Sequence, residues 1–457
     1  MERLFIQDSE FYKRVIRLAI PIILQNLLTN TLNIIDSFIV GSLGETALAA
    51  VTLTNIPIKV VTMFSFGAQS GVSILISQYW GKRDKGSINR ALGVGLWIVT
   101  LVNAIYSFII IKSPVGFLSI FSNEPAIIEE ARQYAVLVSL SYLFNTFSLV
   151  YLAMLRSTER PLFGTYVLSG STLLKLFLDF ALIEGKFGSA SLGIFGAGMA
   201  TLITRVVEFL FILGHMFTNK VVPIQWRSLL LPGKQMVLRF AKNAGTVIFN
   251  ETVWGLGIST ISNVMSHMEG SVAILSAYSV ATNVESLVTS ICSGLHNTAA
   301  VIIGSEIGSG RRTSILKKMG YSLVALALTV GFCAGLLMYL ISTAIGESLI
   351  FPIFHLSEEA SDICLMMIGV LSLVLPFRAL NNTAVVGVLR GGGDVRVAAL
   401  IDVLPLWIGA VPYALFVGSV LHAGIFWVML SYLVQYLIQT AFAVSRLRSD
   451  RWIHQVT

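Results

Sequence analysis

Residues 67–93 read GAQSGVSILISQYWGKRDKGSINRALG, and residues 294–320 read GLHNTAAVIIGSEIGSGRRTSILKKMG. Six identities recur at a constant spacing of 227 residues, and they pair Gly67, Ile76, Gly81, Ser87, Ile88 and Gly93 with Gly294, Ile303, Gly308, Ser314, Ile315 and Gly320. Two further matches follow in the same order, Ile120-Phe121 with Ile353-Phe354 and Leu155-Arg156 with Leu389-Arg390. This ordered pattern favours a duplicated unit over a chance alignment of small residues. Paired membrane repeats are the usual architecture of secondary transporters, so the repeat predicts that class of protein.

The composition places most of the chain in lipid. Hydrophobic residues make up 55% of the 457 residues and charged residues only 12%, against roughly 25% charged residues in soluble proteins. The mean hydropathy is +0.81, and that much apolar surface exceeds what one soluble core can bury. Windows of about 20 residues predict an all-α integral membrane protein with twelve transmembrane helices, near residues 14–40, 46–80, 90–112, 126–155, 161–183, 192–217, 235–265, 270–307, 314–345, 358–389, 395–421 and 422–446.

Basic residues gather on one face of the predicted membrane. They account for 24 of the 31 lysines and arginines: Arg3, Lys13, Arg14, Arg17, Lys82, Arg83, Lys85, Arg90, Arg156, Arg160, Lys220, Arg227, Lys234, Arg239, Lys242, Arg311, Arg312, Lys317, Lys318, Arg390, Arg396, Arg446, Arg448 and Arg451. The opposite loops carry acids instead: Glu45, Glu124, Glu347, Glu358, Glu359 and Asp362. The positive-inside rule therefore predicts that both termini are cytoplasmic. The net charge of +7 follows from this distribution, so we expect a lipid bilayer and no nucleic acid as the partner.

An even number of helices in each half makes the two repeats parallel, related by an axis along the membrane normal. We therefore expect two pseudo-symmetric lobes of six helices each. The first lobe is 1–217 and the second is 239–446, joined by a cytoplasmic linker at 218–238 and followed by a cytoplasmic tail at 447–457. Nothing in the sequence demands more than a monomer.

Ionisable residues inside predicted spans are candidates for function, because each costs roughly 2.5–3.5 kcal/mol to insert. The first half has Asp36, Lys59, Lys175, Asp179, Arg205 and Glu208, whose charges balance. The second half has Glu251, Glu285, Arg378 and Asp402, which sum to a negative charge. A lobe with surplus carboxylates can hide them by binding protons or a metal cation, and that exchange is a coupling mechanism.

In the first lobe, one face of helix 1 carries a polar stripe: Asn26, Thr29, Asn33 and Asp36. Such a stripe is either a hydrogen-bonded seam between helices or the wall of an aqueous cavity. Lys175 and Asp179 are four residues apart and can pair with each other. Arg205 and Glu208 share a helix face with Thr201, and their pair serves either transport or only the insertion of the helix.

In the second lobe, Asn250 and Glu251 lie in the middle of helix 7, and Asp402 lies on helix 11. Arg378 lies on helix 10, with Asn381 one turn further on. One arginine between two acids leaves one carboxylate free to carry a proton, so these residues form a candidate coupling or substrate site. The alternative is a permanent Glu251–Arg378–Asp402 triad that only joins helices. We expect Glu285 nearer the outer end of its helix, within reach of water.

Enzymatic motifs are missing. The glycines of Arg390-Gly391-Gly392-Gly393-Asp394 lack the Lys-Ser/Thr of a phosphate-binding loop and indicate a tight cytoplasmic turn. We therefore expect no enzyme activity and no cofactor.

The chain resembles the multidrug and toxic compound extrusion (MATE) family, in a prokaryotic branch, over essentially its whole length. The resemblance rests on motifs in order: Ala19-Ile20-Pro21 with Asp36, Gly81-Lys82-Arg83-Asp84, Gly193 to Thr201, Asn250-Glu251 with Trp254, Leu389-Arg390-Gly391-Gly392-Gly393-Asp394, and Asp402 with Trp407. It implies two six-helix lobes in a V shape that export small organic cations in exchange for H⁺ or Na⁺ across a bacterial or archaeal cytoplasmic membrane. It also implies a cation-responsive cluster of Asp36, Asp179 and Thr201, with Asn145 as the amide and Na⁺ possible at Asp36 and Asp179. Glu251 matches an acidic position that some members have.

Two departures from the family pattern bear on the coupling ion. Lys175 stands one turn before Asp179, where some members carry an amide, and Arg378 stands where others use an aspartate. A lysine beside Asp179 can replace a bound Na⁺, which favours H⁺ or a coupling site in the second lobe. Two alternatives remain open at this stage: a lipid-linked precursor flippase of a related two-lobe fold, and a channel or receptor without coupled transport.

Overall fold

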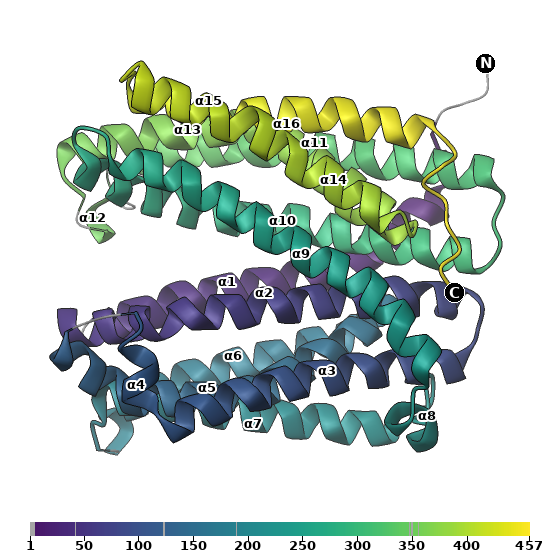
Figure 1. The fold of residues 1–457 in the computed structure, drawn as a ribbon, viewed down its shortest axis with the longest axis horizontal. Coiled ribbons are helices and arrows are strands. Elements are labelled where there is room, and N and C mark those ends of the chain that lie inside the picture. Colours follow the sequence, from purple (N-terminus) through teal and green to yellow (C-terminus); the bar gives the residue numbers. More distant parts are fainter. Residues whose placement is uncertain are drawn as a thin grey trace. The chain divides into compact units, whose positions relative to one another are not determined.

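The computed structural model describes residues 5–41, 43–121, 124–188, 190–346, 348, 351–354 and 356–457. Arg3 and Glu347, which entered the orientation argument, lie outside these residues. Twelve long helical passages make up the described chain (Figure 1): α1 (Ser9–Gly41), α2 (Glu45–Gly81), α3 (Lys85–Lys112), α5 (Pro125–Ser157), α6 (Leu162–Leu182), α7 (Gly193–Thr218), α9 (Lys234–Ser266), α10 (Ser271–Gly308), α11 (Thr313–Ile345), α13 (Glu358–Asn382), a passage that begins with α14 (Val395–Pro405), and α16 (Ile425–Arg448). Shorter helices lie between them: η1 (Lys186–Gly188), α4 (Pro114–Leu118), α8 (Trp226–Leu230) and α12 (Phe351–Ile353).

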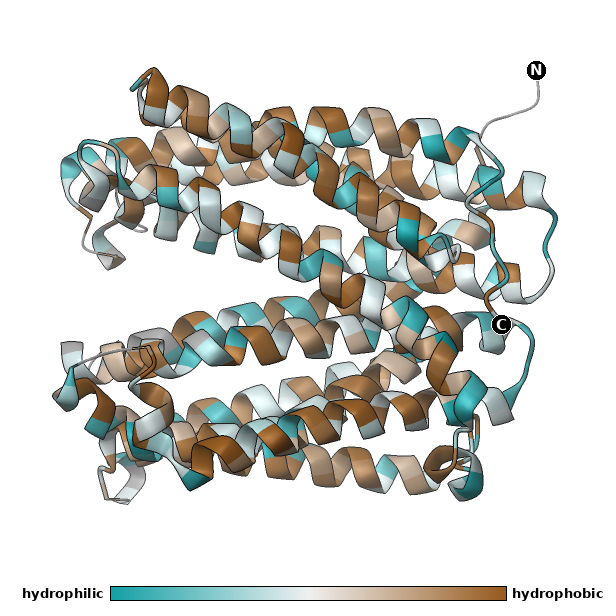
Figure 2. Cartoon of the chain, in the orientation of Figure 1, coloured by the Kyte–Doolittle hydropathy of each residue, from teal (hydrophilic) through white to brown (hydrophobic). Residues whose placement is uncertain are grey.

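The all-α membrane fold expected from the sequence is confirmed. In the part of the chain that the structure describes, eleven of these passages are long and apolar enough to cross a membrane. Hydrophobic residues run the length of the helices in Figure 2. The remaining passage, α9, has 33 residues but carries Lys234, Arg239 and Lys242 in its first part and Glu251 in its middle. Those charges lower its apolar character, while its place in the repeat corresponds to that of α1.

The two passages around α13 and α14 are not regular α-helices. The helix that contains Pro376 continues as the π-helical segment η3 (Thr383–Leu389). The α14 passage continues through η4 (Leu406–Ala410), α15 (Val411–Leu415) and η5 (Phe416–Val420), of which η4 and η5 are π-helical. π-Helical turns inside membrane helices are rare and are often found at functional sites. Here η3 keeps the chain helical as far as Arg390, which therefore does not belong to a solvent-exposed turn.

Contacts divide the chain into two compact units. Unit 1 comprises Met1–Asn26 with Phe249–Thr457, and unit 2 comprises Leu27–Ile248. This division differs from the division by repeat, in which 1–217 and 239–446 form the lobes, because α1 and α9 each begin in one unit and end in the other. A helix of 33 residues is about 50 Å long, well beyond the roughly 30 Å of a bilayer core, so each helix has the length to serve both units.

The repeated glycines explain how each unit accepts the beginning of the other half's leading helix. In unit 2, a Cβ on Gly67 of α2 would lie 2.3 Å from the side chain of Ile248 on α9. In unit 1, a Cβ on the matching Gly294 of α10 would lie 2.2 Å from the side chain of Ile23 on α1. Only glycine permits these helices to approach so closely, and this accounts for one pair of identities in the repeat.

The segment that follows each half packs against the start of the third helix of that half. In the linker, the backbone oxygen of Leu229 would lie 2.1 Å from a Cβ on Gly93, and the Asn89 amide donates to the Pro223 carbonyl (3.1 Å). In the tail, the ring of Trp452 would lie 3.7 Å from a Cβ on the matching Gly320. Trp452 is fully buried, and the His454 N–H donates to the Gly392 carbonyl (2.8 Å). The repeat therefore extends beyond the membrane helices to the linker and the tail.

The close helix contact at Gly294 is testable by one methyl group. We expect Gly294→Ala to lower the free energy of unfolding by about 1–3 kcal/mol, because the added carbon overlaps Ile23. The measurement is the midpoint of thermal unfolding of the purified protein in detergent. Gly170→Ala on α6 is the matched control, since its Cβ meets nothing within 4 Å and alanine is the better helix former by about 1 kcal/mol. Equal midpoints for both variants would contradict the role given to Gly294.

Candidate functional site

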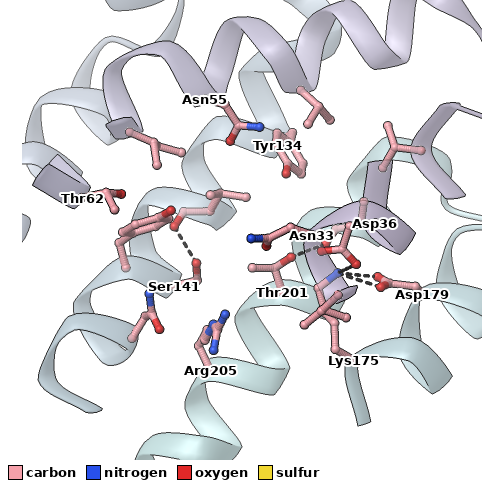
Figure 3. Close-up of a pocket in the computed structure, with 18 of the residues that line it drawn as sticks. Asn33, Asp36, Asn55, Thr62, Tyr134, Ser141, Lys175, Asp179, Thr201 and Arg205 are labelled. Carbon is pink, nitrogen blue, oxygen red and sulfur yellow. Dashed lines mark hydrogen bonds and ion pairs between the residues drawn. The ribbon is translucent and has the colours of Figure 1, made fainter. Parts of the chain in front are cut away.

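Unit 2 contains a cavity of about 500 Å³ between α1, α2, α5, α6 and α7, a volume typical of small-molecule sites (Figure 3). Its wall mixes aliphatic residues with polar and aromatic ones, and the polar and aromatic residues include Asn33, Asp36, Asn55, Lys59, Thr62, Tyr134, Ser141, Tyr142, Asn145, Lys175, Asp179, Thr201 and Arg205. The cavity brings together the first-lobe candidates from the sequence analysis: Asn33, Asp36, Asn145, Lys175, Asp179 and Thr201. The aqueous-wall interpretation of the polar stripe fits its last two members, Asn33 and Asp36.

Three ionisable side chains meet at one end of the cavity. The Lys175 Nζ lies 2.8 and 2.7 Å from the two carboxylate oxygens of Asp179 and 3.0 Å from Oδ1 of Asp36. The pair predicted from the spacing of Lys175 and Asp179 is thus present, and Asp36 joins it from α1. The Asp179 side chain is 1% exposed, whereas that of Asp36 is 31% exposed. Asp179 is held inside the protein, and Asp36 faces the cavity, as Figure 3 shows.

The cavity wall carries further positive charge. Nη1 of Arg205 lies 2.7 Å from a carboxylate oxygen of Glu208, whose side chain is fully buried behind it. This is the internal ion pair that the spacing allowed. Lys59 also lines the cavity, and no ion pair is recorded for it among the described residues. Thr201 lines the cavity and donates its hydroxyl to the Ala197 carbonyl one turn earlier on α7 (2.9 Å).

Unit 1 has a second set of two acids and one base. Arg390 places Nη1 3.0 Å from Oε1 of Glu251 and Nη2 3.1 Å from Oδ2 of Asp402. Asp402 also accepts hydrogen bonds from the amides of Asn250 (2.8 Å) and Gln439 (2.9 Å). The side chains of Glu251 and Asp402 are 22% and 14% exposed, and that of Arg390 only 2%.

The base between Glu251 and Asp402 is Arg390 and not Arg378, which the sequence analysis expected. A triad of Glu251, Arg378 and Asp402 was considered, and Arg390 was assigned to a cytoplasmic turn. The structure places Arg390 between the acids, because η3 continues the helix to Arg390 and only Gly393, at φ +88°, makes the turn. Arg378 does not reach either acid.

Arg378 pairs instead with Glu285, with Nη1 2.5 Å from Oε1. Glu285 is buried, so the expectation that it lies within reach of water near the outer end of its helix is wrong. Asn381 is fully buried as well, and its amide donates to the Tyr436 carbonyl and the Thr440 hydroxyl (both 2.9 Å). Asn381 therefore supports α16 and does not touch the acids.

The sequence analysis missed Arg390 and Gln439 as members of the site. Gln439 could have been found from the sequence, because Gln435 and Gln439 are four residues apart in an apolar helix and so share one helix face. Among the described residues, no group of three or more His, Cys, Asp or Glu is placed to hold a metal ion. At Asp36 and Asp179, three of the four carboxylate oxygens accept hydrogen bonds from Lys175.

Comparison with known proteins agrees with this architecture. A family model described as MatE matches residues 21–181 and 248–415, one segment in each half of the repeat. A probable multidrug resistance protein NorM of Thermotoga maritima is 23% identical over 449 residues, which cover 97% of this chain and 93% of that protein. Another NorM, from Bradyrhizobium diazoefficiens, is 26% identical over 418 residues, covering 89% of this chain and 86% of that protein.

Solved structures show the same fold at low identity. A mutant form of the Vibrio cholerae MATE transporter VcmN aligns with a TM-score of 0.86 at 17% identity, covering 98% of this chain and 99% of that one. A MOP superfamily transporter from Pyrococcus furiosus, described as having a binding pocket of reverse polarity, aligns with a TM-score of 0.84 at 18% identity, covering 96% of each chain. Because the family model matches most of its length, the chain belongs to the MatE family of membrane transporters.

Proposed function

We propose that this chain is a proton-coupled antiporter that exports small organic cations from a bacterial or archaeal cell. Relatives named as probable multidrug resistance proteins support the export of drug-like compounds. The observation that carries the proposal is that two carboxylates share one base in each unit. If both acids are ionised, each set has one surplus negative charge, which a proton or a cationic substrate can neutralise.

In each set, one acid is held more tightly than the other. Asp179 is bonded to Lys175 through both oxygens, and Asp402 accepts from Arg390, Asn250 and Gln439. Asp36 and Glu251 each have one recorded contact with the shared base and are the more exposed members of their sets. Asp36 and Glu251 are therefore the acids that take up and release the proton.

The antiport cycle follows from this charge. When Asp36 is ionised, the Asp36–Lys175–Asp179 set has one surplus negative charge that attracts an organic cation, and Lys59 in the same cavity wall offsets part of that attraction. Tyr134 and Tyr142 also line the cavity and can bind the cation through their aromatic rings. When a proton binds to Asp36, Lys175 stays paired with Asp179 and the attraction for the cation is lost. Substrate and proton thus compete for one negative charge, which is the condition for exchange.

The shared base also favours H⁺ over Na⁺. The Lys175 ammonium occupies the position between the two carboxylates where a Na⁺ ion would bind, and Arg390 does the same between Glu251 and Asp402. A proton needs only one carboxylate oxygen and does not displace the base. The proposal therefore requires no metal ion and no cofactor.

The two weakly held acids lie on the two helices that have residues in both units. Asp36 lies on α1 and Glu251 on α9, and these are the two helices that run from one unit into the other. A change in protonation at either acid therefore acts on a helix that both units share. We propose that α1 and α9 transmit the change that underlies alternating access, in a protein that works as a monomer.

The orientation is proposed from charge. The basic residues gather at the helix ends on the side of the termini, and the positive-inside rule makes that side cytoplasmic. Arg390 is buried and is therefore left out of the count of basic residues on the cytoplasmic side. The remaining basic residues still lie on that side and support the same orientation.

A second candidate has one observation in its favour. Lys59, Lys175 and Arg205 all line the unit 2 cavity, and a lipid-linked precursor flippase needs basic groups to hold an anionic pyrophosphate. The acid partners of Lys175 and Arg205 leave Lys59 as the one base in this cavity wall with no recorded ion pair among the described residues, so we rank this candidate second.

The choice of ion is tested in proteoliposomes loaded with a fluorescent lipophilic cation. We expect efflux to follow an imposed pH gradient and to ignore a Na⁺ gradient of the same size. The Glu251→Gln and Asp36→Asn variants should lose the pH-driven component. Glu10→Gln, on the exposed face of α1, is the control that should retain it. Efflux driven by Na⁺ alone would reject proton coupling, and transport of a lipid-linked precursor without gradient dependence would favour the flippase.

The role of Lys175 is tested by its removal. We expect Lys175→Gln to create a Na⁺ site from Asp36 and Asp179, so that Na⁺ raises the thermal midpoint of the variant but not that of the wild type. Binding to the folded state alone stabilises by RT ln(1 + [L]/Kd), about 2.7 kcal/mol at a hundredfold excess over Kd. Choline chloride at equal ionic strength is the control. A wild-type protein that Na⁺ stabilises as much as the variant would show that the lysine does not exclude the ion.

A further inference from the structure

The interior of unit 1 contains a polar stripe that the acid site only partly uses. On α16, Tyr432, Gln435, Tyr436 and Gln439 occupy positions i, i+3, i+4 and i+7 and so lie on one helix face. They are 7%, 1%, 6% and 1% exposed, so this face points into the protein and not to lipid. We name these four residues the α16 stripe.

One end of the stripe meets a pair of tyrosines and an ion pair. The hydroxyls of Tyr432 and Tyr278 are 2.8 Å apart, and Tyr278 lies two turns into α10 and is only half-buried. Tyr432 and Tyr436 both interact electrostatically with Glu285, the partner of Arg378. This end therefore combines two hydroxyl groups that can relay a proton with a tyrosine side chain, Tyr278, that is partly exposed.

The other end of the stripe meets the acid site. The Gln439 amide donates to Oδ1 of Asp402 (2.9 Å), and Arg390 connects Asp402 to Glu251. Tyr436 stands between Tyr432 and Gln439 on this stripe, and its backbone carbonyl accepts a hydrogen bond from the Asn381 amide (2.9 Å). His296 on α10 is also buried in unit 1.

Several buried polar atoms on the α16 stripe and on α13, η3 and α10 have no hydrogen-bond partner among the described residues. They are both amide atoms of Gln435, Oε1 of Gln439, Oδ1 of Asn381, Oγ1 of Thr383 and Nδ1 of His296. A buried polar group left without a partner costs about 1–3 kcal/mol, and internal water is the usual partner where several such atoms lie together. A hydrogen-bonded seam between helices would explain Gln439 and Asn381, but not Gln435, whose side chain bonds to no described residue.

We propose that a chain of internal water along the α16 stripe conducts protons between the Tyr278–Tyr432 end of unit 1 and the Glu251–Arg390–Asp402 site. Gln435 orients the water in the middle of the chain. It is a positioning residue, because an amide does not itself carry the proton. Each hydroxyl or water donates one proton as it accepts another, and the last water leaves its proton on a Glu251 oxygen, converting the carboxylate to the acid. The inference rests on the proposed function, because it supplies the route by which the coupling proton arrives.

The test is Gln435→Leu, which keeps the side-chain size and removes the polar atoms. We expect pH-driven exchange in proteoliposomes to slow at least tenfold, with the external proton uptake followed by a pH-sensitive dye. Equilibrium binding of the fluorescent cation, and its exchange in the absence of a proton gradient, should stay at the wild-type level, since neither needs a new proton. Ser342→Ala on α11 is the control, because it removes another buried, unpartnered polar atom of unit 1 away from the stripe.

A second readout detects the water itself. Hydroxyl radicals formed by an X-ray pulse label side chains in contact with internal water, so we expect Tyr436 to be labelled in the wild type and much less in Gln435→Leu. Unchanged pH-driven exchange or unchanged Tyr436 labelling in that variant would overturn the water route. Loss of gradient-free exchange together with pH-driven exchange would assign Gln435 a structural role only. A wild type with no pH-driven exchange would reject the proposed function, which is a separate result.

Discussion

Two carboxylates that share one buried base are the interaction on which the rest of this structure depends. An isolated ion in a membrane interior is costly, and a paired ion is tolerated only when its geometry is good. In unit 2 Lys175 bonds to both oxygens of Asp179 and to one of Asp36, whereas in unit 1 Arg390 makes one contact with each acid and Asp402 gains further hydrogen bonds from Asn250 and Gln439. In the proposed mechanism the acid with the single contact is the one that accepts a proton or attracts a cation. The two sets also come from corresponding helices: the first and fifth helix of each half, α1 with α6 and α9 with α14, supply the acids. The bases differ in origin, since Lys175 lies on α6 and Arg390 follows η3.

The duplicated architecture gives these sites their connection. Gly67 and Gly294 allow α9 and α1 to enter the unit of the opposite half, and each helix continues into its own unit, where it carries Glu251 or Asp36. The more weakly held acid of each set is therefore on the helix that both units share. In the proposed mechanism, protonation changes the local charge on a helix whose residues belong to both units, and this shared helix is the element through which the coupling ion would act on substrate binding. If the α16 stripe delivers the proton to Glu251, the route of the proton and the cavity of the substrate lie in different units.

The sequence was sufficient for the helices and for local pairs. Long apolar runs determine the spans, and a spacing of three or four residues determines which side chains on one helix can meet, as for Lys175 with Asp179 and Arg205 with Glu208. The sequence could not predict which side chains on different helices would pair, because pairing depends on how each helix is rotated about its axis and shifted along it. Arg378 and Arg390 both follow apolar helix segments, and only the π-helical segment η3 brings Arg390 to Glu251 and Asp402. Three consecutive glycines suggested a turn that begins at Arg390, whereas the chain turns at Gly393. Buried amides such as Gln435 were not predicted to be functional, because the sequence does not show which group on another helix a polar side chain would contact.

The most direct test of the account is to count protons when substrate binds. The purified protein in weakly buffered detergent solution is titrated with a lipophilic cation while a pH indicator follows the medium. The account predicts a net release of protons that falls in Asp36→Asn and Glu251→Gln and does not depend on Na⁺. Substrate binding without proton release, or with release of Na⁺ in place of protons, would contradict it.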